Sequence, residues 1–384
     1  MANDKSFKIK NGLSAKRYLQ SSTAVAASDV DMSLGSYFTK TLSANTTFTF
    51  SNPPASGTAG SFALEVTGAD VTVGYDLANA AYDSVSFSVG SQETNPEGLF
   101  ISTDGTKMYV CGISADAVFQ YSLSTANDLS TASYDSVSFS TSSQAAAPSG
   151  LFFKPDGTKM YINNQGDGNI YEYNLSTAWD ISSTSYSNNS INVSTQSADI
   201  MGVDFKPDGT KMYLISAQQN IYQYSLSTAW DVSTATYDSI SFSVSSQETA
   251  PESVRFSSDG TKMFVVGQIA DTVFQYSLST AWDLSTASYA NISIYINPSE
   301  SSPHEIAFSY DGTKMFIVGK KVDSVTQYST AATAAATITY PASVKWSGAT
   351  TPDAPAAGEK DVYVFVTTDG GTTYYGKQAG DAVA

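Results

Sequence analysis

The sequence predicts an all-β protein in which a five-bladed β-propeller is inserted into a small β-sandwich or barrel-like domain built from both chain termini. Three observations lead to this prediction: a repeat of about 50 residues, short strands within each repeat, and a different strand style outside the repeats. The chain has 384 residues, and its 41% hydrophobic content is sufficient for a sizeable core. Its 24 Tyr and 19 Phe residues favour strands over helices.

The repeat is marked by the string DGTKM, which occurs five times at spacings of 51 or 52 residues. Its aspartates are Asp104, Asp156, Asp208, Asp259 and Asp311. A second landmark, the tyrosine that opens YDSVSFS-like segments, has the same period, at Tyr82, Tyr134, Tyr186, Tyr237 and Tyr289. Self-similarity at this period, with four strands in each unit, is typical of a propeller blade.

In the first repeat we expect strands at residues 98–102, 107–112, 117–123 and 134–140. The Asp-Gly pair between the first two is a strong hairpin signal, because Gly accepts a positive φ and Asp bonds its own turn backbone. The second strand is apolar on both faces, so we expect neighbouring blades to cover it. The fourth strand alternates apolar and polar residues, so we place it on the outer rim.

The order of the strands also predicts how the ring closes. A strand of the fourth type, residues 82–88, precedes the first DGTKM, whereas the fifth repeat stops after its third strand near Tyr328. We therefore predict that residues 82–88 complete the fifth blade and remove the edge strands that would otherwise invite aggregation. The predicted propeller spans residues 76–330.

The segments that flank the repeats predict one composite β domain. Residues 36–70 contain alternating Thr/Phe strands and a Pro-Pro turn, and residues 336–377 end in a hairpin around Asp-Gly-Gly. Each segment alone offers too few strands for an independent core. We therefore predict a domain built from residues 36–75 and 331–384, with 1–35 as an N-terminal arm and the propeller inserted at an exposed turn.

Charge and rare residue types narrow the possible partners. The net charge of −17 repels phosphate backbones and anionic lipids, so we expect no nucleic-acid partner and no membrane insertion. A single cysteine, Cys111, and a single histidine, His304, exclude an internal disulfide, a thiolate cluster and a His-rich metal site. We predict no metal ion and no cofactor, and the start of the chain lacks the apolar stretch of a secretory signal.

Two recurring motifs have both a structural and a functional interpretation. The DGTKM aspartates could ligate cations, but a lone turn carboxylate more often accepts hydrogen bonds from local N–H groups. The tryptophans of the AWD loops, Trp179, Trp230 and Trp282, could stack on sugar rings, but such a ring more often pins its loop to the blade. The fifth repeat lacks a recognisable AWD element. We favour the structural interpretation of both motifs.

Two sets of loops differ between the repeats, whereas the hairpin turns and AWD loops stay uniform. They join the second strand to the third and the fourth strand to the next blade, and in a propeller they share one face around the channel mouth. We predict a binding site in these loops, with relaxed, solvated loops as the alternative. The candidates are Gln92, Glu93, Asn164, Gln165, Asp167, Gln218, Gln219, Gln247, Glu248, His304, Lys320 and Lys321.

The flanking segments resemble virion structural proteins of tailed bacteriophages, marine ones especially. The resemblance rests on the stretches FKIKNGLSAKR, YFTKTLSANTTFTFSNPPASGTAGSFALEVTG and ITYPASVKWSGATTPDAPAAGEKDVYVFVTTDGGTTYYGKQAGDAVA. It implies a component of the virion, either a tail fibre, a tail appendage or a capsid decoration, assembled in the host cytoplasm. It also implies contacts with other virion proteins through the composite domain, and a homo-oligomer.

These observations together predict a non-enzymatic virion protein that displays its propeller for adhesion to the host surface or to a glycan. One alternative is a glycan-degrading virion enzyme, which needs two carboxylates about 5 to 10 Å apart. Its candidates near the channel mouth are Glu93, Glu248, Glu300 and Glu305. No nucleophile elbow, Cys–His signature or phosphate-binding loop supports an enzyme, so we predict no catalytic residue. The second alternative is a decoration or spacer without a ligand.

Overall fold

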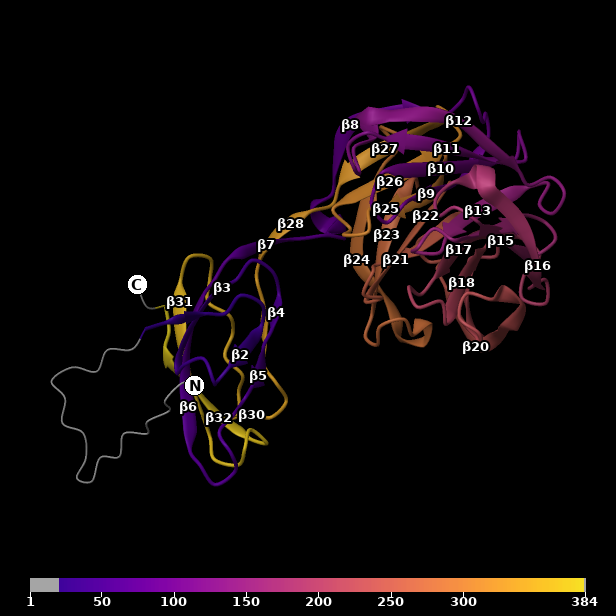
Figure 1. The fold of residues 1–384 in the computed structure, drawn as a ribbon. Helices are drawn as coiled ribbons and strands as arrows, with labels where there is room; N and C mark the ends of the chain where they lie inside the picture. The colour runs from indigo at the N-terminus through magenta and orange to yellow at the C-terminus, as the bar shows by residue number, and fades with distance from the viewer. Residues whose placement is uncertain (1–20, 383–384) are drawn as a thin grey trace, which may run out of the picture. The chain divides into compact units, whose positions relative to one another are not determined.

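The computed structural model describes residues 21–382, which form two compact units. The larger unit, Thr72–Ala332, is a five-bladed β-propeller, and its blades are four-stranded antiparallel sheets arranged around one axis (Figure 1). The predicted fold class is therefore confirmed. None of the helices described in residues 21–382 has the length and apolar character needed to cross a membrane.

The strands of each blade follow one another from the axis outward. The first two blades comprise β9 (Pro96–Ile101), β10 (Lys107–Gly112), β11 (Ala117–Leu123) and β12 (Ala132–Ser140), then β13 (Pro148–Phe153), β14 (Lys159–Asn164), β15 (Asn169–Leu175) and β16 (Thr184–Asn192). The third and fourth comprise β17 (Ile200–Phe205), β18 (Lys211–Ser216), β19 (Asn220–Leu226) and β20 (Ala235–Ser243), then β21 (Pro251–Phe256), β22 (Lys262–Gly267), β23 (Thr272–Leu278) and β24 (Ala287–Tyr295). The fifth comprises β25 (Pro303–Phe308), β26 (Lys314–Gly319), β27 (Ser324–Ser329) and β8 (Ala81–Ser88).

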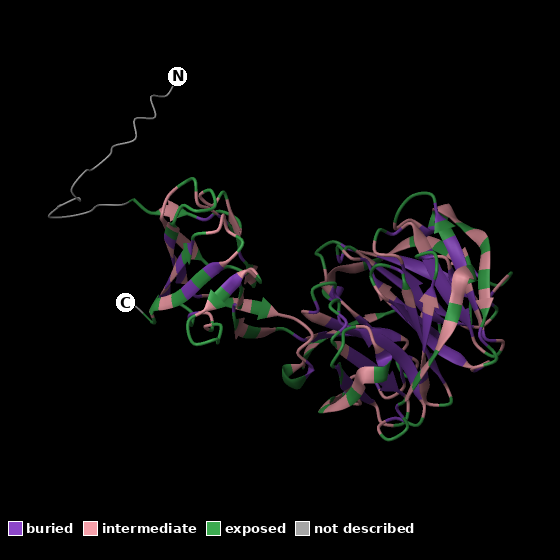
Figure 2. Ribbon diagram, turned by 90° about the horizontal axis from the view of Figure 1, so that it is seen from below, coloured by how far each residue is buried: buried purple, intermediate pink, exposed green. Residues whose placement is uncertain are grey.

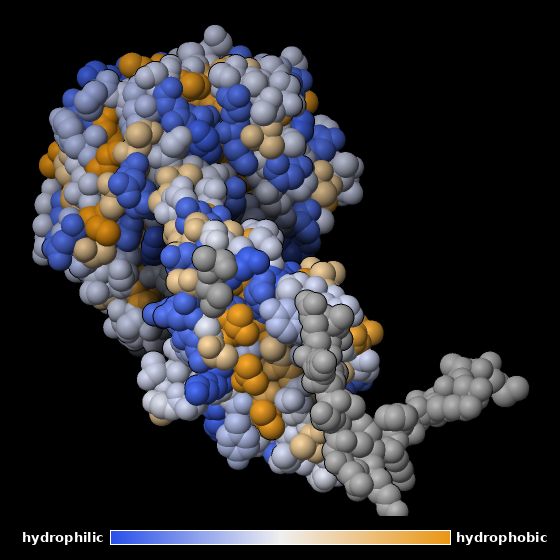
Figure 3. Space-filling view, turned by 90° about the vertical axis from the view of Figure 1, so that its left-hand side faces the viewer, coloured by the Kyte–Doolittle hydropathy of each residue, from blue (hydrophilic) through white to orange (hydrophobic). Residues whose placement is uncertain are grey.

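Burial follows the predicted gradient from the axis to the rim. The inner strands and the second strands are almost wholly buried, whereas the fourth strands alternate, as Figure 2 shows. Hydrophilic side chains cover most of the face drawn in Figure 3, and the hydrophobic ones stand in small groups. Inside the propeller, the buried hydrophobic side chains form separate clusters, each between two adjacent blades.

The ring closes as predicted, because β8 pairs with β27 and completes the fifth blade. In this antiparallel pair Tyr82 lies opposite Tyr328 and Phe87 opposite Val325. The start and end of the propeller segment also meet, since the backbone N–H of Asp76 donates to the Thr330 carbonyl at 2.9 Å. The inner strands β25 and β9 are in contact, so the last and first blades are neighbours. The ring leaves no unpaired edge at this seam.

A short 3₁₀ turn precedes the fourth strand of every blade, and an aspartate stands immediately before each of these turns. The turns are η1 (Leu77–Asn79), η2 (Leu129–Thr131), η3 (Ile181–Ser183), η4 (Val232–Thr234) and η5 (Leu284–Thr286). The turn η1 serves blade five, so this blade has the element that the sequence comparison found missing. Its wording differs, because Tyr75 stands where the other loops have Trp or Asn. The Tyr75 N–H donates to the Gly312 carbonyl as the Trp230 N–H donates to that of Gly209.

The AWD loops fasten each blade to the preceding one. Trp230 is buried, and its ring lies 5.7 Å from that of Phe205 and stacks on Phe152 at 6.3 Å. The hydroxyl of Tyr161, one blade earlier, donates to the Trp230 carbonyl at 2.8 Å. Gly209 has φ +74°, and a Cβ there would lie 2.4 Å from the indole, so the turn requires glycine. These contacts fit the structural interpretation for Trp230, and Trp282 also lines the cavity at the hairpin end of the axis.

The DGTKM aspartates close their own turns. Asp104 Oδ1 accepts hydrogen bonds from the Ser102 hydroxyl at 2.6 Å and the Thr106 N–H at 3.0 Å. Burial alone would raise the pKa of Asp104, but these bonds outweigh it and lower the pKa. In blades two and three a lysine two residues earlier pairs with the aspartate. These contacts fit the turn interpretation.

The smaller unit is built from residues 21–71 and 333–382. Its main sheet has the order β1 (Thr23–Ala24), β3 (Tyr37–Thr41), β6 (Gly60–Thr67), β31 (Lys360–Thr367), β32 (Tyr374–Gly380) and β30 (Val344–Trp346). Two-stranded sheets pair β2 (Asp29–Asp31) with β5 (Thr49–Ser51) and β4 (Thr46–Thr47) with β29 (Ile338–Thr339). A further pair, β7 (Asp70–Val73) and β28 (Ala332–Ala335), forms where the chain passes between the units.

The two halves of this unit share one core. β6 pairs in parallel with β3 and antiparallel with β31, so the strands of the N-terminal segment and those of the C-terminal segment join into one sheet at the β6–β31 pair. Phe50 of β5 packs against Phe62 and Phe365 with ring centroids 4.9 Å apart in both cases. The sequence places residues 1–35 in an arm, whereas β1 and β2 belong to this unit because Val30 is fully buried in its core. Residues 1–20, which include the FKIKNGLSAKR stretch, lie outside the described residues.

Candidate functional site

The five inner strands line the axis and carry their functional side chains at two levels. We call the end where these strands begin the loop end, and the end with the DGTKM hairpins the turn end. Near the loop end, the second residues of the strands are Glu97, Ser149, Met201, Glu252 and His304. Near the turn end, the fifth residues are Phe100, Phe152, Asp204, Arg255 and Ala307.

Arg255 lies between the two ends and bonds the inner strands of the other four blades. Its guanidinium donates to the backbone carbonyls of Leu99 at 3.3 Å, Leu151 at 2.9 Å, Val203, and Ile306 at 3.1 Å. Arg255 is only 6% exposed, so these bonds form in a dehydrated environment where they are strong. The side chain therefore acts as a hub that holds the blades to one another across the axis.

Two buried carboxylates accompany the hub. Arg255 Nη2 lies 3.2 Å from Glu305 Oε2, and Arg255 Nη1 lies 3.8 Å from Asp204 Oδ1. Burial raises the pKa of Asp204 to about 6 and that of Glu305 to about 8, although the Arg255 charge opposes both shifts. The Asp204 carboxylate also accepts the backbone N–H groups of Phe205 at 2.9 Å and Phe256 at 2.8 Å. It therefore links the third and fourth blades.

The loop end holds a second buried cluster. His304 Nδ1 lies 2.6 Å from Glu97 Oε2 and 3.6 Å from Glu252 Oε2. Lys320 Nζ lies 2.7 Å from the other oxygen of Glu97, and the Gln268 amide donates to the other oxygen of Glu252. The pKa of Glu252 is raised to about 8 by burial, with a further contribution from the Glu97 charge. Two acids, an imidazole and an ammonium thus converge on one point of the axis.

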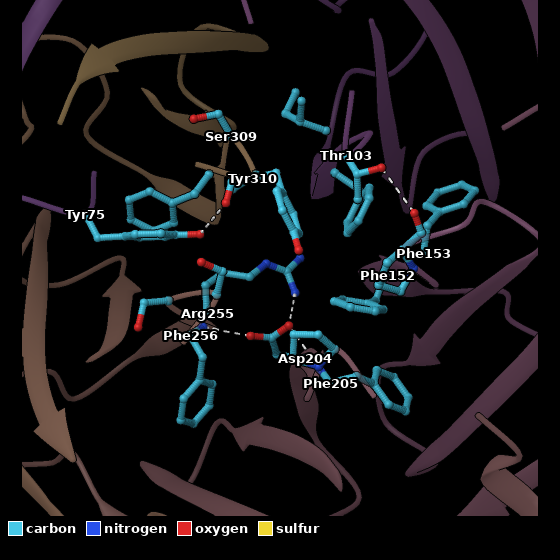
Figure 4. Close-up of a pocket in the computed structure, with 18 of the residues that line it drawn as sticks. Tyr75, Thr103, Phe152, Phe153, Asp204, Phe205, Arg255, Phe256, Ser309 and Tyr310 are labelled. Atoms are coloured by element: carbon cyan, nitrogen blue, oxygen red, sulfur yellow. Dashed lines mark hydrogen bonds and ion pairs between the residues drawn. The ribbon is translucent and has the colours of Figure 1, made fainter. Parts of the chain in front are cut away.

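The turn end holds a small cavity of about 110 Å³ with mainly aromatic walls (Figure 4). Tyr75 and Tyr310 lie on one side and Phe152 on the other, and Arg255 and Asp204 lie between them. The Tyr75 hydroxyl donates to the Tyr310 carbonyl at 3.3 Å, and the Arg255 guanidinium lies over the Phe152 ring at 5.9 Å. Aromatic faces around a few polar groups are typical of a site for a small ring-shaped ligand.

Three predicted site residues reach the axis at the loop end. His304 and Lys320 belong to the buried cluster. The Gln165 amide nitrogen lies 3.5 Å from Met201 Sδ, and Met201 occupies the same position of its inner strand as Glu97. The structure therefore brings His304 and Lys320 of blade five together around Glu97, and Gln165 of blade two reaches Met201 of blade three instead.

The other predicted residues are not brought together. Those that bond within or beside their own loops are Gln92, Glu93, Asn164, Asp167, Gln218, Gln219, Gln247 and Glu248. Glu93 is representative, since it is 1% exposed and accepts the N–H groups of Asn95 at 2.7 Å and Ala115 at 3.0 Å. Lys321 is exposed. These side chains shape the loops of separate blades rather than one site.

The four carboxylates named for the enzyme alternative do not form a pair, because each has a different structural contact. Glu93, Glu248 and Glu300 each accept backbone N–H groups of their own loop, in blades one, four and five. Glu305 pairs with Arg255 at the hub. The carboxylates that do approach each other are Glu97 and Glu252, which the sequence analysis did not single out.

Glu97, Glu252 and Arg255 were missed although the repeats carry a signal for them. Each stands in the innermost strand, which is buried on both faces, at a position where other repeats have Ser, Met, Phe or Ala. A charged residue in such a strand must find a partner there. Alignment of the five inner strands by their first residue would therefore have placed Glu97, Glu252 and His304 at one level.

Comparisons with known proteins bear on the fold alone. No family model matches the sequence, and no curated protein matches it. Similar solved structures include two proteins described as "putative 6-phosphogluconolactonase". The one from Bacteroides fragilis is 12% identical with TM-score 0.38 over 55% of this chain and 56% of that one, and the one from Bacteroides uniformis is 14% identical with TM-score 0.37 over 70% and 66%. The chain thus spans less than two thirds of the length of either protein.

A functionally unknown protein from Desulfotomaculum acetoxidans is 12% identical, with TM-score 0.38 over 75% of this chain and 86% of that one. At these identities and scores the likeness carries no information about activity, ligand or partner. The class of this protein is a β-propeller, and its function is argued from its own residues.

Proposed function

We propose that this protein is a non-enzymatic component of a phage particle that displays its propeller as a carbohydrate-binding module. The observation that carries the binding role is the aromatic cavity at the turn end. The resemblance of the flanking segments supports membership of the particle, and the insertion of the propeller into a unit made from both chain ends suits a mounted module.

The walls of the cavity favour a sugar ring as the ligand. Tyr310 is 57% exposed at the rim, and Tyr75 and Phe152 line the interior. Such rings offer rigid flat surfaces to the apolar face of a sugar, and Ser258 stands in the same lining. The cavity volume of about 110 Å³ leaves room for part of one terminal ring and not for a long chain.

Binding without turnover is supported by the hydrogen bonds of Arg255 and Asp204, the charged groups beneath the cavity. The Arg255 donors are engaged by four backbone carbonyls, and both oxygens of Asp204 accept backbone N–H groups. These groups hold the scaffold and are not disposed as an acid–base pair around an open bond. We therefore assign them to the floor of a binding site.

Binding is tested with the full chain on immobilised glycans and on bacterial surface polysaccharides. We expect binding by the wild type and a loss of at least about fivefold for Tyr310→Ala, because a well-packed aromatic contact is worth about 1 kcal/mol or more. Tyr295→Ala is the matched control, since Tyr295 is equally exposed on the outer strand β24. Lys321→Ala tests the loop face. Failure of every glycan to bind, or equal binding by Tyr310→Ala, would overturn the assignment.

Two further measurements test the rest of the proposal. Release of reducing ends from a bound polysaccharide would favour the enzyme alternative over simple adhesion. Antibodies against the propeller should label tailed particles in a lysate of the host, at the head, the neck or the tail. Purified particles without label or peptides of this chain would exclude a virion role.

A further inference from the structure

We propose that Glu97, Glu252 and His304 form a binding site for one divalent transition-metal ion, Zn²⁺ in the first instance, at the loop end of the propeller axis. This site is independent of the proposed carbohydrate cavity, which lies at the other end. The ligand atoms would be one oxygen of each carboxylate and the Nδ1 atom of the imidazole.

The three ligand atoms already lie close together. One atom from each residue falls within 4.8 Å of the others, and Nδ1 of His304 is 2.6 Å from Glu97 and 3.6 Å from Glu252. A tetrahedral Zn²⁺ with bonds of about 2.0 to 2.2 Å separates its ligands by roughly 3.3 Å. The observed separations lie on both sides of this value, so small side-chain rotations suffice to admit the ion.

The histidine supplies an independent sign of a missing ligand. His304 is 2% exposed, and within the described part of the chain neither of its ring nitrogens has a hydrogen-bond partner. Its Nδ1 is close to Glu97 Oε2 but does not have the alignment of a hydrogen bond. Buried polar groups nearly always find partners, and a metal ion on the Nδ1 lone pair would be one.

Neighbouring side chains hold the two carboxylates in the orientation that metal binding requires. Lys320 binds Glu97 Oε1 at 2.7 Å, and the Gln268 amide binds Glu252 Oε1. In each carboxylate the remaining oxygen, Oε2, is therefore the one turned to His304. Metal-binding carboxylates are commonly fixed in this way by a hydrogen bond to their second oxygen.

Charge and donor type indicate the kind of cation. Two buried carboxylates face only one ammonium group, that of Lys320. Because an unbalanced buried negative charge is costly, a dication at this place would be stabilising. One imidazole and two carboxylate oxygens suit Zn²⁺ and its transition-metal neighbours, whereas Ca²⁺ takes six or more oxygen ligands. The ligands stand at equivalent positions of the buried inner strands β9, β21 and β25.

The site is tested with the full chain, first freed of metal by a chelator and then titrated with Zn²⁺ by calorimetry. We expect about one ion per chain, and a loss of at least about 100-fold in affinity for Glu252→Gln and for His304→Gln, since each removes a ligand. Asp199→Asn, which alters a loop-end carboxylate outside the cluster, is the matched control and should bind as the wild type does. Zinc should also raise the Tm of the wild type and not that of Glu252→Gln.

A second readout keeps the proposal falsifiable if a variant does not fold. Co²⁺ added to the wild type should give the intense visible absorption of a four-coordinate site, and Zn²⁺ should abolish it. Absence of stoichiometric zinc binding, a Co²⁺ spectrum like that of the hydrated ion, or full binding by folded Glu252→Gln would overturn the site. Glycan binding that persists in chelator separates this result from the proposed function.

Discussion

Arg255 Nη2 donates a hydrogen bond to the Leu151 carbonyl at 2.9 Å, and this bond ties the fourth blade to the second across the propeller axis. The same guanidinium bonds three other inner strands. Adjacent blades of a propeller share side-chain packing, but blades on opposite sides of the ring ordinarily communicate only through their neighbours. A single buried cation that reaches all of them makes the centre of this ring a common contact.

Replacement of the hub should destabilise the whole propeller. We expect Arg255→Met to lower the free energy of unfolding by about 3 to 5 kcal/mol, because it leaves the Asp204 carboxylate buried without its counter-charge and the backbone carbonyls at the axis without their donor. Urea denaturation measures the loss. Lys206→Met removes a lysine from a half-exposed turn pair and should cost less than about 1 kcal/mol. Equal losses in the two variants would show that the hub contributes no more than a surface pair.

The buried acid beside the hub predicts a dependence on pH. Burial raises the pKa of Asp204 to about 6, so the folded chain holds a proton that the unfolded chain releases near pH 4. The stability from this group is complete below pH 4 and is lost as the pH rises through 6. We expect the wild type to lose up to about 3 kcal/mol more than Asp204→Asn between pH 4 and pH 7.

The measurement compares the free energy of unfolding of the two proteins at both pH values. Groups that do not interact with Asp204 cancel in the difference between wild type and Asp204→Asn. Parallel pH profiles for the two proteins would mean that Asp204 is ionised throughout and that Arg255 fully compensates its burial.

The seam between β8 and β27 should be the first place where the ring opens. Asp83 of β8 binds Lys314, Gln327 and Ser329, each at 2.7 Å. Burial opposes its ionisation, but these partners outweigh burial and lower the pKa of Asp83, as those of Asp135 do in blade one. The two aspartates therefore have matching contacts. Strand β12, which carries Asp135, directly follows the other three strands of its blade in the sequence, whereas β8 precedes the first blade and pairs with the last.

We therefore expect Asp83→Asn and Asp135→Asn to cost similar free energies, about 1 to 2 kcal/mol. Only Asp83→Asn should speed amide hydrogen exchange in β8 and β27, by roughly tenfold. The reason is that β8 is not joined by a short loop to the other strands of its blade, so it can detach while they stay folded. Mass spectrometry of the exchanged peptides distinguishes the two. The same acceleration in β12 of Asp135→Asn would mean that the seam is no weaker than a continuous blade.

The sequence was informative where structure repeats and less so where repeats depart from their pattern. Five copies of DGTKM were sufficient for the blade count, the strand order and the closure by residues 82–88. Of the divergent-loop candidates, His304 and Lys320 meet at the loop end, but most of the others, such as Glu93, bind their own backbone, and the cavity lies at the opposite end. Convergence on an axis depends on residues about 50 to 200 positions apart, such as Glu97 and His304, and spacing along the chain does not reveal it.

The clearest departure is Tyr75, which stands where three other blades have a tryptophan. It was missed because it lies before the first repeat and in different wording, although its N–H bonds Gly312 as the tryptophans bond their turns. Its ring lies 5.1 Å from Phe308 and 6.0 Å from Phe264. Packing therefore keeps the role of the residue while its identity changes.

This equivalence predicts opposite outcomes for two substitutions at one position. Tyr75→Trp should change the free energy of unfolding by less than about 1.5 kcal/mol, because the indole occupies the corresponding place in blades two, three and four. Tyr75→Ala should cost about 3 to 5 kcal/mol, because it removes the ring that packs against both Phe264 and Phe308. Urea denaturation measures both, with Tyr295→Ala on the exposed rim as control. If Tyr75→Trp is as damaging as Tyr75→Ala, then Tyr75 does not serve as the tryptophan of the fifth blade.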